Sequence, residues 1–505
     1  MKEKFIVSLL SQVISYLISL FAFYLIFLNL DTILIGIWTL VNSIVNLGFL
    51  FINIGLDAIH YQYSGKKDSS DYFGTFFTIK LLLLFTNVLI SVLLIFFISF
   101  TELWSNNFFF LVLFLLLSKI IFNVANVFSI NLKSRIKVFR AEIPAFIVIF
   151  GKSISIIFLT LNLSYFSNPL LYISISNFVF DLIFLMLILL FSKNEYKLNK
   201  PSKNLALLYL KDVKPLFFFS LTLVIATNLG NLILDYSFGH EALGYFSFIN
   251  DYIINTLLVF SGSLITIYLT LFSNFFEKGD LSSIRKFTFV IEKYTSIIFL
   301  LVIIIVILNG RLILSIFLPQ YVETAFILNI MVFIPYFLSI SQPYSYQFIA
   351  GKKQKTNAYI NIFTRSIIIL LMIFLIPSNL FFIPSLGLGS IGYALSQTLP
   401  WIIWMIINKY YSYRIFKIKP QKNILLHILL ASISLFILFA LKYLIFKNII
   451  LNQIFLLIIT TIVSFGIFIL LLILFKELRR EDLKFFFQLI KFQSYKNSLK
   501  EEFLN

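Results

Sequence analysis

Long apolar runs separated by short polar connections make up almost the whole sequence. Fourteen runs are long enough to cross a bilayer as a helix, which takes about 20 residues. They cover residues 5–28, 36–57, 76–100, 107–130, 143–163, 169–192, 213–234, 243–271, 292–308, 325–349, 358–376, 387–408, 424–445 and 452–475. Barrel strands alternate in polarity and need only about 10 residues each, so these continuous runs predict an all-α integral membrane protein.

Composition supports lipid as the solvent. Of the 505 residues, 60% are hydrophobic and 12% are charged, whereas soluble domains are about a quarter charged. Phe contributes 63 residues, and the mean hydropathy is +0.98. The absence of cysteine excludes disulfides and thiolate chemistry. The net charge of +18 does not indicate a nucleic-acid partner, because the basic residues lie in short loops between apolar runs.

The basic loops alternate with nearly uncharged ones. About 33 of the 40 Lys and Arg fall on the side of the N-terminus, which the positive-inside rule places in the cytoplasm. An even number of spans places the C-terminus there too. The first run lacks a small-residue cleavage site and is expected to be retained as a span. We therefore expect a multi-pass protein of the bacterial cytoplasmic (inner) membrane, with no soluble domain on either face.

An internal repeat suggests two halves. LIGIWTLVN (34–42) and ALGYFSFIN (242–250) align at an offset of 208, which pairs Gly36 with Gly244 and Thr39 with Ser247. Both stretches open spans that run from outside to inside, so the repeat is parallel. The expected organisation is a six-helix N-terminal lobe (1–192), an interfacial linker (193–212), a six-helix C-terminal lobe (213–408), two additional helices (409–475) and an amphipathic tail (476–505). The alternative for the linker and the tail is a plain solvated segment.

Charges within the spans are the candidate functional residues, because a charge at membrane depth costs at least about 2.5 kcal/mol. Lys119, Asn123 and Asn126 share one helical face. Lys119 and Asp181 are expected about 16 Å from the cytoplasmic ends of their spans, and Lys152 about 13 Å. Two interpretations stay open: Lys152 and Asp181 pair structurally, or the excess positive charge lines a cavity and attracts a diphosphate.

Other charges carry weaker expectations. Arg365 either receives a phosphate near the cytoplasmic mouth or extends to headgroups. Asp235 and Asp251 either bind a coupling cation or are ordinary polar helix ends. Four residues are expected near water or headgroups at span ends, namely Asp57, His60, Lys80 and Lys442.

Several stretches resemble the bacterial polysaccharide flippases. They are LDYSFGHEALGYFSFINDY (234–252), NFFEKGDLSSIRKFTFVIEKY (274–294), RLILSIFLPQYVETAFIL (311–328), GKKQKTNAYINIF (351–363) and PSLGLGSIGYALSQTL (384–399). With fourteen spans, the resemblance covers essentially the whole chain. It implies the fold of the multidrug/oligosaccharidyl-lipid/polysaccharide exporter superfamily, which is MATE-like, with two lobes facing a central cavity. It also implies flipping of an undecaprenyl-diphosphate-linked oligosaccharide, such as an O-antigen unit, for lipopolysaccharide or a similar surface polysaccharide.

Alternatives of the same fold are a drug/cation antiporter and a peptidoglycan-precursor flippase. A membrane glycan polymerase is less favoured, because such enzymes carry a large external loop. FGKS (150–153) is not a phosphate-binding loop, since Phe146 stands where that motif needs Gly. We expect no enzyme activity, cofactor or metal. The expected partners are the lipid-linked substrate, membrane lipids, a proton or sodium counter-ion and polysaccharide polymerase machinery, acting on a monomer.

Overall fold

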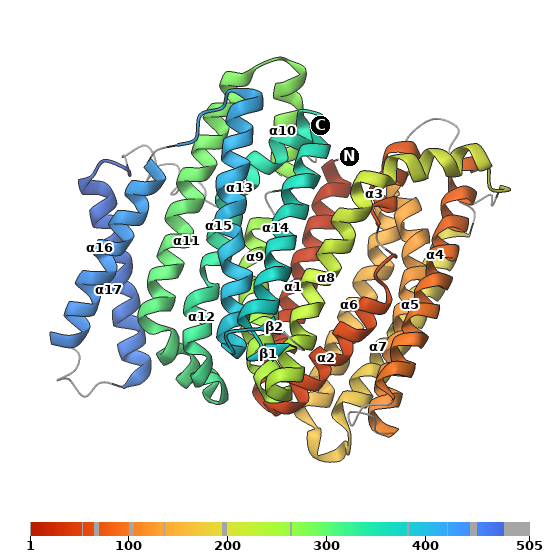
Figure 1. The fold of residues 1–505 in the computed structure, drawn as a ribbon, viewed down its shortest axis with the longest axis horizontal. Helices are drawn as coiled ribbons and strands as arrows, with labels where there is room; N and C mark the ends of the chain where they lie inside the picture. The colour runs from red at the N-terminus through yellow and green to blue at the C-terminus, as the bar shows by residue number, and fades with distance from the viewer. Residues whose placement is uncertain are drawn as a thin grey trace. The chain divides into compact units, whose positions relative to one another are not determined.

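The computed structural model describes residues 2–52, 54–64, 70–99, 106–135, 137–193, 199–262, 265–380, 383–421, 423–444 and 452–478. Over these residues the chain is almost entirely helical (Figure 1). Chain contacts divide it into two compact units. Unit 1 holds residues 1–247 and 361–393, and unit 2 holds residues 248–360 and 394–505.

Unit 1 is a helical bundle. Its elements are α1 (Lys2–Asn29), α2 (Thr32–Gly48), α3 (Leu56–Ser64), α4 (Ser70–Ile98), α5 (Asn106–Ser134), α6 (Val138–Leu161), the 3-10 turn η1 (Leu163–Tyr165), α7 (Pro169–Ser192), α8 (Lys203–Ser247), most of α14 (Gln354–Leu375) and a two-stranded hairpin. The hairpin pairs β1 (Asn379–Leu380) antiparallel with β2 (Ile383–Pro384). Helix α5 packs against α7, α6 lies against both α1 and α7, and α2 packs against α8. Figure 1 shows α4 to α7 running side by side.

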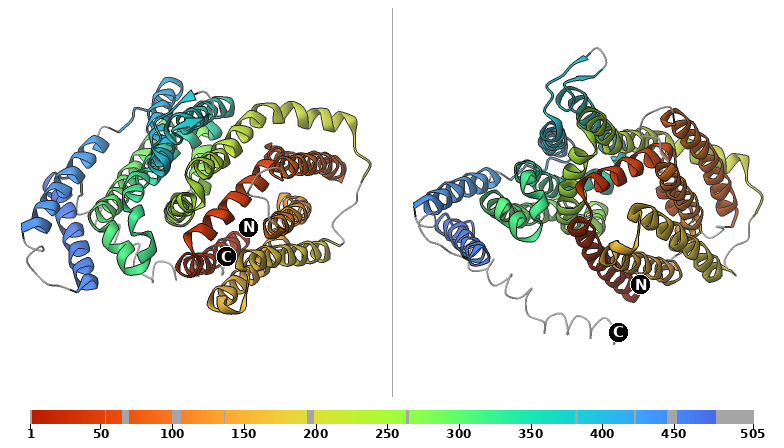
Figure 2. Two further views of the ribbon diagram at one scale, coloured as in Figure 1. Left: turned by 60° about the horizontal axis from the view of Figure 1, so that its bottom comes forward. Right: turned by 90° about the horizontal axis from the view of Figure 1, so that it is seen from below.

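Unit 2 is built around α11. Its elements are the π-helical turn η2 (Phe248–Ile254), α9 (Asn255–Gly262), α10 (Ile265–Glu277), α11 (Leu281–Phe317), the 3-10 turn η3 (Pro319–Thr324), α12 (Ala325–Met331), α13 (Phe333–Ala350), most of α15 (Gly389–Phe416), α16 (Asn423–Leu444) and α17 (Gln453–Leu474). Helix α11 contacts α13, α16 and α17. Figures 1 and 2 show α16 and α17 lying side by side, and their contact with each other is direct.

The expected all-α membrane fold is confirmed. Within the described residues, eleven helices are long and apolar enough to cross a membrane, and α1 and α2 add shorter apolar helices. One of the eleven, Leu216–Val259, overlaps two of the fourteen expected segments, 213–234 and 243–271. Gly239 separates them, because its φ of 82° and ψ of 175° interrupt α8 with a conformation that glycine adopts at little cost.

The exposure of apolar side chains within the spans also agrees with a lipid environment. In α4 only 17% of the most apolar window is buried inside the protein, and Leu82 and Phe85 each expose 63% of their surface. Phe436 in α16 exposes 77%. Apolar surface exposed on this scale would be unstable in water, so these faces are suited to contact acyl chains. The chain is a multi-pass membrane protein.

Helix starts follow from local sequence. The side chain of Asn168 accepts a hydrogen bond from the Leu171 amide at 3.2 Å, and Pro169 occupies the first position of α7. Asp280 caps α11 by accepting from the Ser283 amide at 3.0 Å. Such caps satisfy amides that have no partner within the helix.

The repeat is visible where α2 crosses the end of α8. A Cβ on Gly36 would lie 1.8 Å from the carbonyl oxygen of His240, and a Cβ on Gly244 would lie 2.0 Å from that of Thr32. The hydroxyls of Thr39 and Ser247 are 2.9 Å apart. Positions i and i+208 therefore exchange partners across the contact, which is the pattern of a two-fold axis. Only glycine permits this approach of the two backbones.

Two boundaries differ in detail from the expected ones. The second run was expected to extend to residue 57, but α2 ends at Gly48 and the short α3 begins at Leu56. The stretch NLALLYLKDV of the expected linker is the first part of α8, which curves in the left panel of Figure 2. The limits of the two lobes and of the linker stay predictions, and the tail from residue 479 lies outside the described residues.

Candidate functional site

Asp181 is the centre of a buried polar cluster in unit 1. It lies on α7, where its side chain is 3% exposed. Lys152 on α6 places its Nζ 2.6 Å from Asp181 Oδ1. Ser118 on α5 donates a hydrogen bond to Asp181 Oδ2. The carboxylate thus has a partner on each oxygen from two different helices, which compensates for its removal from water.

Lys119 follows Ser118 on α5 and is half-buried. Among the described residues, no carboxylate lies within ion-pair distance of its ammonium, although its charge interacts with that of Asp181. Lys119, Lys152 and Asp181 together carry two positive charges and one negative charge. Because Lys152 already pairs with Asp181, the excess positive charge of the cluster resides on Lys119.

The two asparagines on the Lys119 face behave differently. Asn123 donates to the carbonyl oxygen of Lys119 at 2.7 Å, a bond within its own helix. Its side chain also lines a small cavity of about 10 Å³ with Lys80 and Val127. Asn126 is half-buried. Thus Asn123 retains one amide hydrogen and its oxygen for a further partner.

The remaining candidate residues do not join this cluster. Asp235 is buried in α8 and pairs with His240, Oδ1 to Nδ1, at 2.6 Å. Asp251 belongs to unit 2, where its Oδ1 accepts from the Asn250 amide at 2.8 Å. Arg365 is half-buried on α14 in unit 1. Within the described residues, no group of three or more His, Cys, Asp or Glu is placed to hold a metal ion.

A line of hydrogen bonds joins α2 to α8, and we call it the α2–α8 polar seam. It consists of Thr39 with Ser247 (2.9 Å), Ser43 with Asn231 (2.8 Å) and Asn46 with Asn228 (3.3 Å). At its centre the Tyr393 hydroxyl donates to Asn231 Oδ1 at 2.9 Å. Sequence reasoning missed most of these residues, although the i, i+4, i+7 spacing of the three α2 residues was a usable signal.

A second buried network lies in unit 2. Glu292 on α11 has a fully buried side chain, with Lys409 Nζ 2.9 Å from Oε1. The Tyr344 hydroxyl donates to Oε2 at 2.7 Å. Beside them Gln347 donates to Thr288 at 2.8 Å and accepts from Ser412 at 2.6 Å. Glu292 is the first residue of the apolar run 292–308, and Lys409 directly follows the run 387–408.

The expectation of water or headgroups was wrong for His60 and Lys80, whereas Asp57, whose side chain is 27% exposed, and the half-buried Lys442 stay partly exposed. His60 is completely buried, between the Tyr209 hydroxyl at 2.9 Å and Asn131 Oδ1 at 3.1 Å. Lys80 is 5% exposed and pairs with Asp57 at 2.6 Å. Lys442 donates to the Leu308 carbonyl at 2.7 Å. Buried polar side chains need partners inside the protein, because packing removes them from water even at the end of a span.

Burial lowers the pKa of His60, on the short helix α3, to about 4. The imidazole is neutral near pH 7, so one ring nitrogen donates and the other accepts. Its ring stacks on Phe76 with centroids 4.0 Å apart. The cluster ties α3 to α4, α5 and the first turns of α8.

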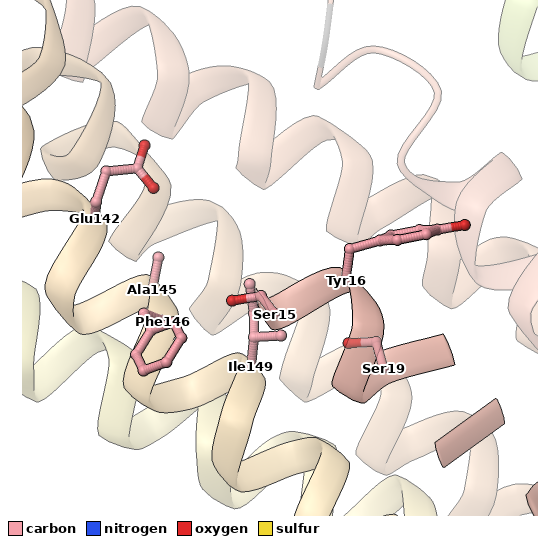
Figure 3. A pocket seen from close by; sticks show the side chains of 7 residues that line it. All are labelled: Ser15, Tyr16, Ser19, Glu142, Ala145, Phe146 and Ile149. Carbon is pink, nitrogen blue, oxygen red and sulfur yellow. The ribbon is translucent and has the colours of Figure 1, made fainter. Parts of the chain in front are cut away.

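A cavity of about 220 Å³ lies between α1 and α6 in unit 1. Figure 3 shows Ser15 and Ser19 on α1 facing the part of α6 that carries Ala145, Phe146 and Ile149, with Glu142 at one end and the Tyr16 ring directed away from α6. Glu142 pairs with Lys133 at 2.9 Å. The lining is mostly apolar, and its only carboxylate is already neutralised, so the cavity has little to offer a charged ligand.

Comparisons with known proteins identify the fold. No family model and no curated protein matches the sequence. Among solved structures, one described as the lipid II flippase MurJ in an inward closed conformation matches with a TM-score of 0.71 at 17% identity, covering 94% of this chain and 99% of that chain. The chain has the fold of these membrane flippases and of MATE transporters.

Two further solved structures bear this out. An inward-facing MATE family transporter of the MOP superfamily matches with a TM-score of 0.62 at 12% identity, covering 80% of this chain and 95% of that one. A MOP superfamily transporter from Pyrococcus furiosus, described as having a binding pocket of reverse polarity, matches at 0.53 and 12% identity, covering 82% and 94%. These two structures each leave about a fifth of this chain unmatched.

Proposed function

We propose that this chain is a flippase, a transporter that moves an undecaprenyl-diphosphate-linked oligosaccharide to the outer leaflet for surface polysaccharide synthesis. The observation that carries the proposal is the excess cation at Lys119. It stands at membrane depth in a fold shared with a lipid II flippase, beside a carboxylate whose oxygens are already taken by Lys152 and Ser118.

The chemistry of the cargo suits such a cation. A diphosphate must leave water to pass through the protein, and a fixed positive charge in a medium of low dielectric constant offsets part of that cost. An ammonium binds as a compact point charge without the two-pronged geometry of arginine, so it also lets the anion depart. Asn123 can add a hydrogen bond to a sugar or phosphate oxygen.

Movement of the cargo needs two alternating openings. The α2–α8 polar seam is suited to close the outer side. Its side chains bond to each other when the helices approach and to water when they part, so opening leaves few polar groups without partners. The backbone contact at Gly36 and Gly244 limits how closely α2 and α8 can approach, which defines the geometry of the closed state.

A second candidate cargo is a peptidoglycan-precursor lipid. The support is the 94% coverage by the structure described as a lipid II flippase. A drug/cation antiporter is less favoured, because the MATE structures match about four fifths of the chain and because Asp181 is neutralised by Lys152.

The test is to replace Lys119 in a strain where this chain is the only polysaccharide flippase. Lys119→Ala should lower surface polysaccharide at least tenfold, roughly the loss expected for about 1.4 kcal/mol of binding energy. Lys119→Arg should retain most of it. Lys442→Ala is the matched control, since it removes another lysine near a span end, whose hydrogen bond among the described residues goes to the Leu308 carbonyl.

Membrane levels of each variant must equal those of the wild type. Normal polysaccharide with Lys119→Ala would remove Lys119 from the transport path. The protein could instead rescue a strain depleted of its lipid II flippase and fail to rescue a polysaccharide flippase deletion. That result would identify the peptidoglycan-precursor lipid as the cargo in place of the oligosaccharide.

A further inference from the structure

A basic cavity of about 590 Å³ lies at one end of unit 2. It is formed by Arg285 and Phe289 on the first turns of α11, by Tyr413 near the end of α15 and by the segment that leads into α16. That segment contributes Lys419, Gln421 and Asn423. The charge asymmetry of the loops places this end of the helices at the cytoplasmic surface of the membrane.

Two cations converge on the cavity without a counter-ion. Among the described residues, neither Arg285 nor Lys419 has a carboxylate within 4 Å, whereas six other basic side chains do, namely Lys80, Lys133, Lys152, His240, Lys409 and His427. Two carboxylates lie beside the lining, and both already have partners. Glu477 is bound by Asn423 at 2.9 Å and by His427 at 3.2 Å, and Glu292, which accepts from the Gln421 backbone amide, pairs with Lys409 at 2.9 Å. The cavity therefore carries a net positive charge.

The other lining residues favour an anion that carries both a hydrogen-bond donor and an apolar part. The Arg285 guanidinium lies over the Phe289 ring at 5.2 Å, which leaves its donor edge for an anion. Gln421 Oε1 is buried and has no hydrogen-bond donor among the described residues. Phe289 and Tyr413 add apolar surface, and Leu425, two residues beyond Asn423, is 75% exposed.

We propose that this cavity binds a lipid phosphate. The phosphate would lie between Arg285 and Lys419, a hydroxyl of the headgroup would donate to Gln421, and an acyl or prenyl chain would follow the apolar surface at Phe289 and Leu425. Basic pockets of this kind at the cytoplasmic side of membrane helices are suited to anionic headgroups. The phosphate has two sources, a glycerophospholipid and a polyprenyl carrier. The proposal stands without the transport function proposed above.

The experiment measures lipid binding to the purified full-length protein in a nonionic detergent by native mass spectrometry. The probes are phosphatidylglycerol, undecaprenyl phosphate, zwitterionic phosphatidylcholine and inorganic phosphate. The R285Q/K419Q variant is compared with K286Q/K417Q, which removes two exposed basic residues from the same segments and changes the charge equally. Each site cation removed should weaken binding roughly fivefold.

Retention of either phosphate lipid by the wild type and the control, with a loss of roughly 25-fold in R285Q/K419Q, supports the proposal. The lipid that binds more tightly identifies the source. Equal binding by all three proteins would overturn it, as would binding of inorganic phosphate as tight as that of both lipids. If the double variant has a lower melting temperature than the control, the single variant K419Q, at an exposed loop position, is used in its place. The proposal then predicts a roughly fivefold loss of lipid affinity in K419Q, and unchanged affinity would overturn it.

Discussion

At the scale of single residues, we propose a structural role for one pair of intramembrane charges and a functional role for Lys119. Asp181 and Lys152 form a buried ion pair that Ser118 completes, and Lys119 retains a charge that the pair does not neutralise. Removing one member of a buried pair leaves the other charge unpaired, which costs more than removing both. This asymmetry allows mutations to distinguish a structural pair from the substrate-binding cation that we propose at Lys119.

We therefore expect Lys152→Met alone to destabilise the protein by about 3 kcal/mol, because Asp181 then stays buried with only Ser118 as a partner. The double variant Lys152→Met/Asp181→Asn should recover at least about 1 kcal/mol of that loss. Thermal melting in detergent measures both. Equal destabilisation by the single and double variants would show that the two side chains do not depend on each other.

His60 predicts a pH dependence of stability. Its pKa is about 4 in the folded protein and 6.5 when exposed, so the unfolded state binds the proton more readily. The folded state is fully favoured above pH 6.5 and loses roughly 3 kcal/mol as the pH falls to 4. The melting temperature of the wild type should drop between pH 7 and 4.5 by more than that of His60→Gln. An equal drop in both proteins would mean that His60 is not buried as described.

At the scale of elements, the contact between α2 and α8 has the most specific geometry. Thr39 and Ser247 are 208 positions apart, equal to the repeat offset, and their hydroxyls meet at 2.9 Å. The chain contains no cysteine, so any disulfide detected in a double-cysteine variant must join the two introduced residues. Disulfide formation requires that the two side chains approach as these do.

The T39C/S247C variant should cross-link within minutes under mild oxidation. The control T39C/Y236C, which places its second cysteine at a residue that is 83% exposed, should not. Cross-linking should also stop transport, and reduction should restore it, if the seam must open during each cycle. Full transport by the cross-linked protein would exclude the seam as the outer closure.

Sequence patterns predicted the elements better than their contacts. Apolar length located the helices, because every backbone group in lipid must bond within its own segment. The repeat predicted that Gly36 and Gly244 are equivalent, and the structure adds that they meet. The partners of Ser118, Asn231 and Glu292 could not be predicted, because they lie on helices distant in sequence. His60 was misplaced because a polar residue near a span end suggests water, whereas its actual neighbours are Tyr209 and Asn131.

At the scale of the whole molecule, the account depends on the topology as well as on the fold. From the charge asymmetry of the loops we expect both termini to be cytoplasmic, with η1 outside and the turn after α13 inside. Tyr165 in η1 is 83% exposed, and Lys352 follows α13 on an exposed turn. Both positions tolerate a cysteine without disturbing a buried contact.

In intact cells, Y165C should react with a membrane-impermeant maleimide, and K352C should react only after the membrane is opened. Cysteine labelling followed by a gel-shift assay measures this. The reverse labelling pattern would show that the orientation in the membrane is opposite to the expected one, with the cavity at Arg285 at the outer surface.

The most direct test of the central claim is translocation by the purified protein in sealed vesicles. A lipid-linked oligosaccharide diphosphate with a label on its sugar is placed in both leaflets, and a membrane-impermeant reagent reports the fraction that becomes accessible with time. The account predicts that the wild type exposes the inner pool, that Lys119→Arg retains most of the rate and that Lys119→Ala loses at least tenfold. A wild-type rate no faster than that of empty vesicles, or a Lys119→Ala rate equal to that of the wild type, would contradict it.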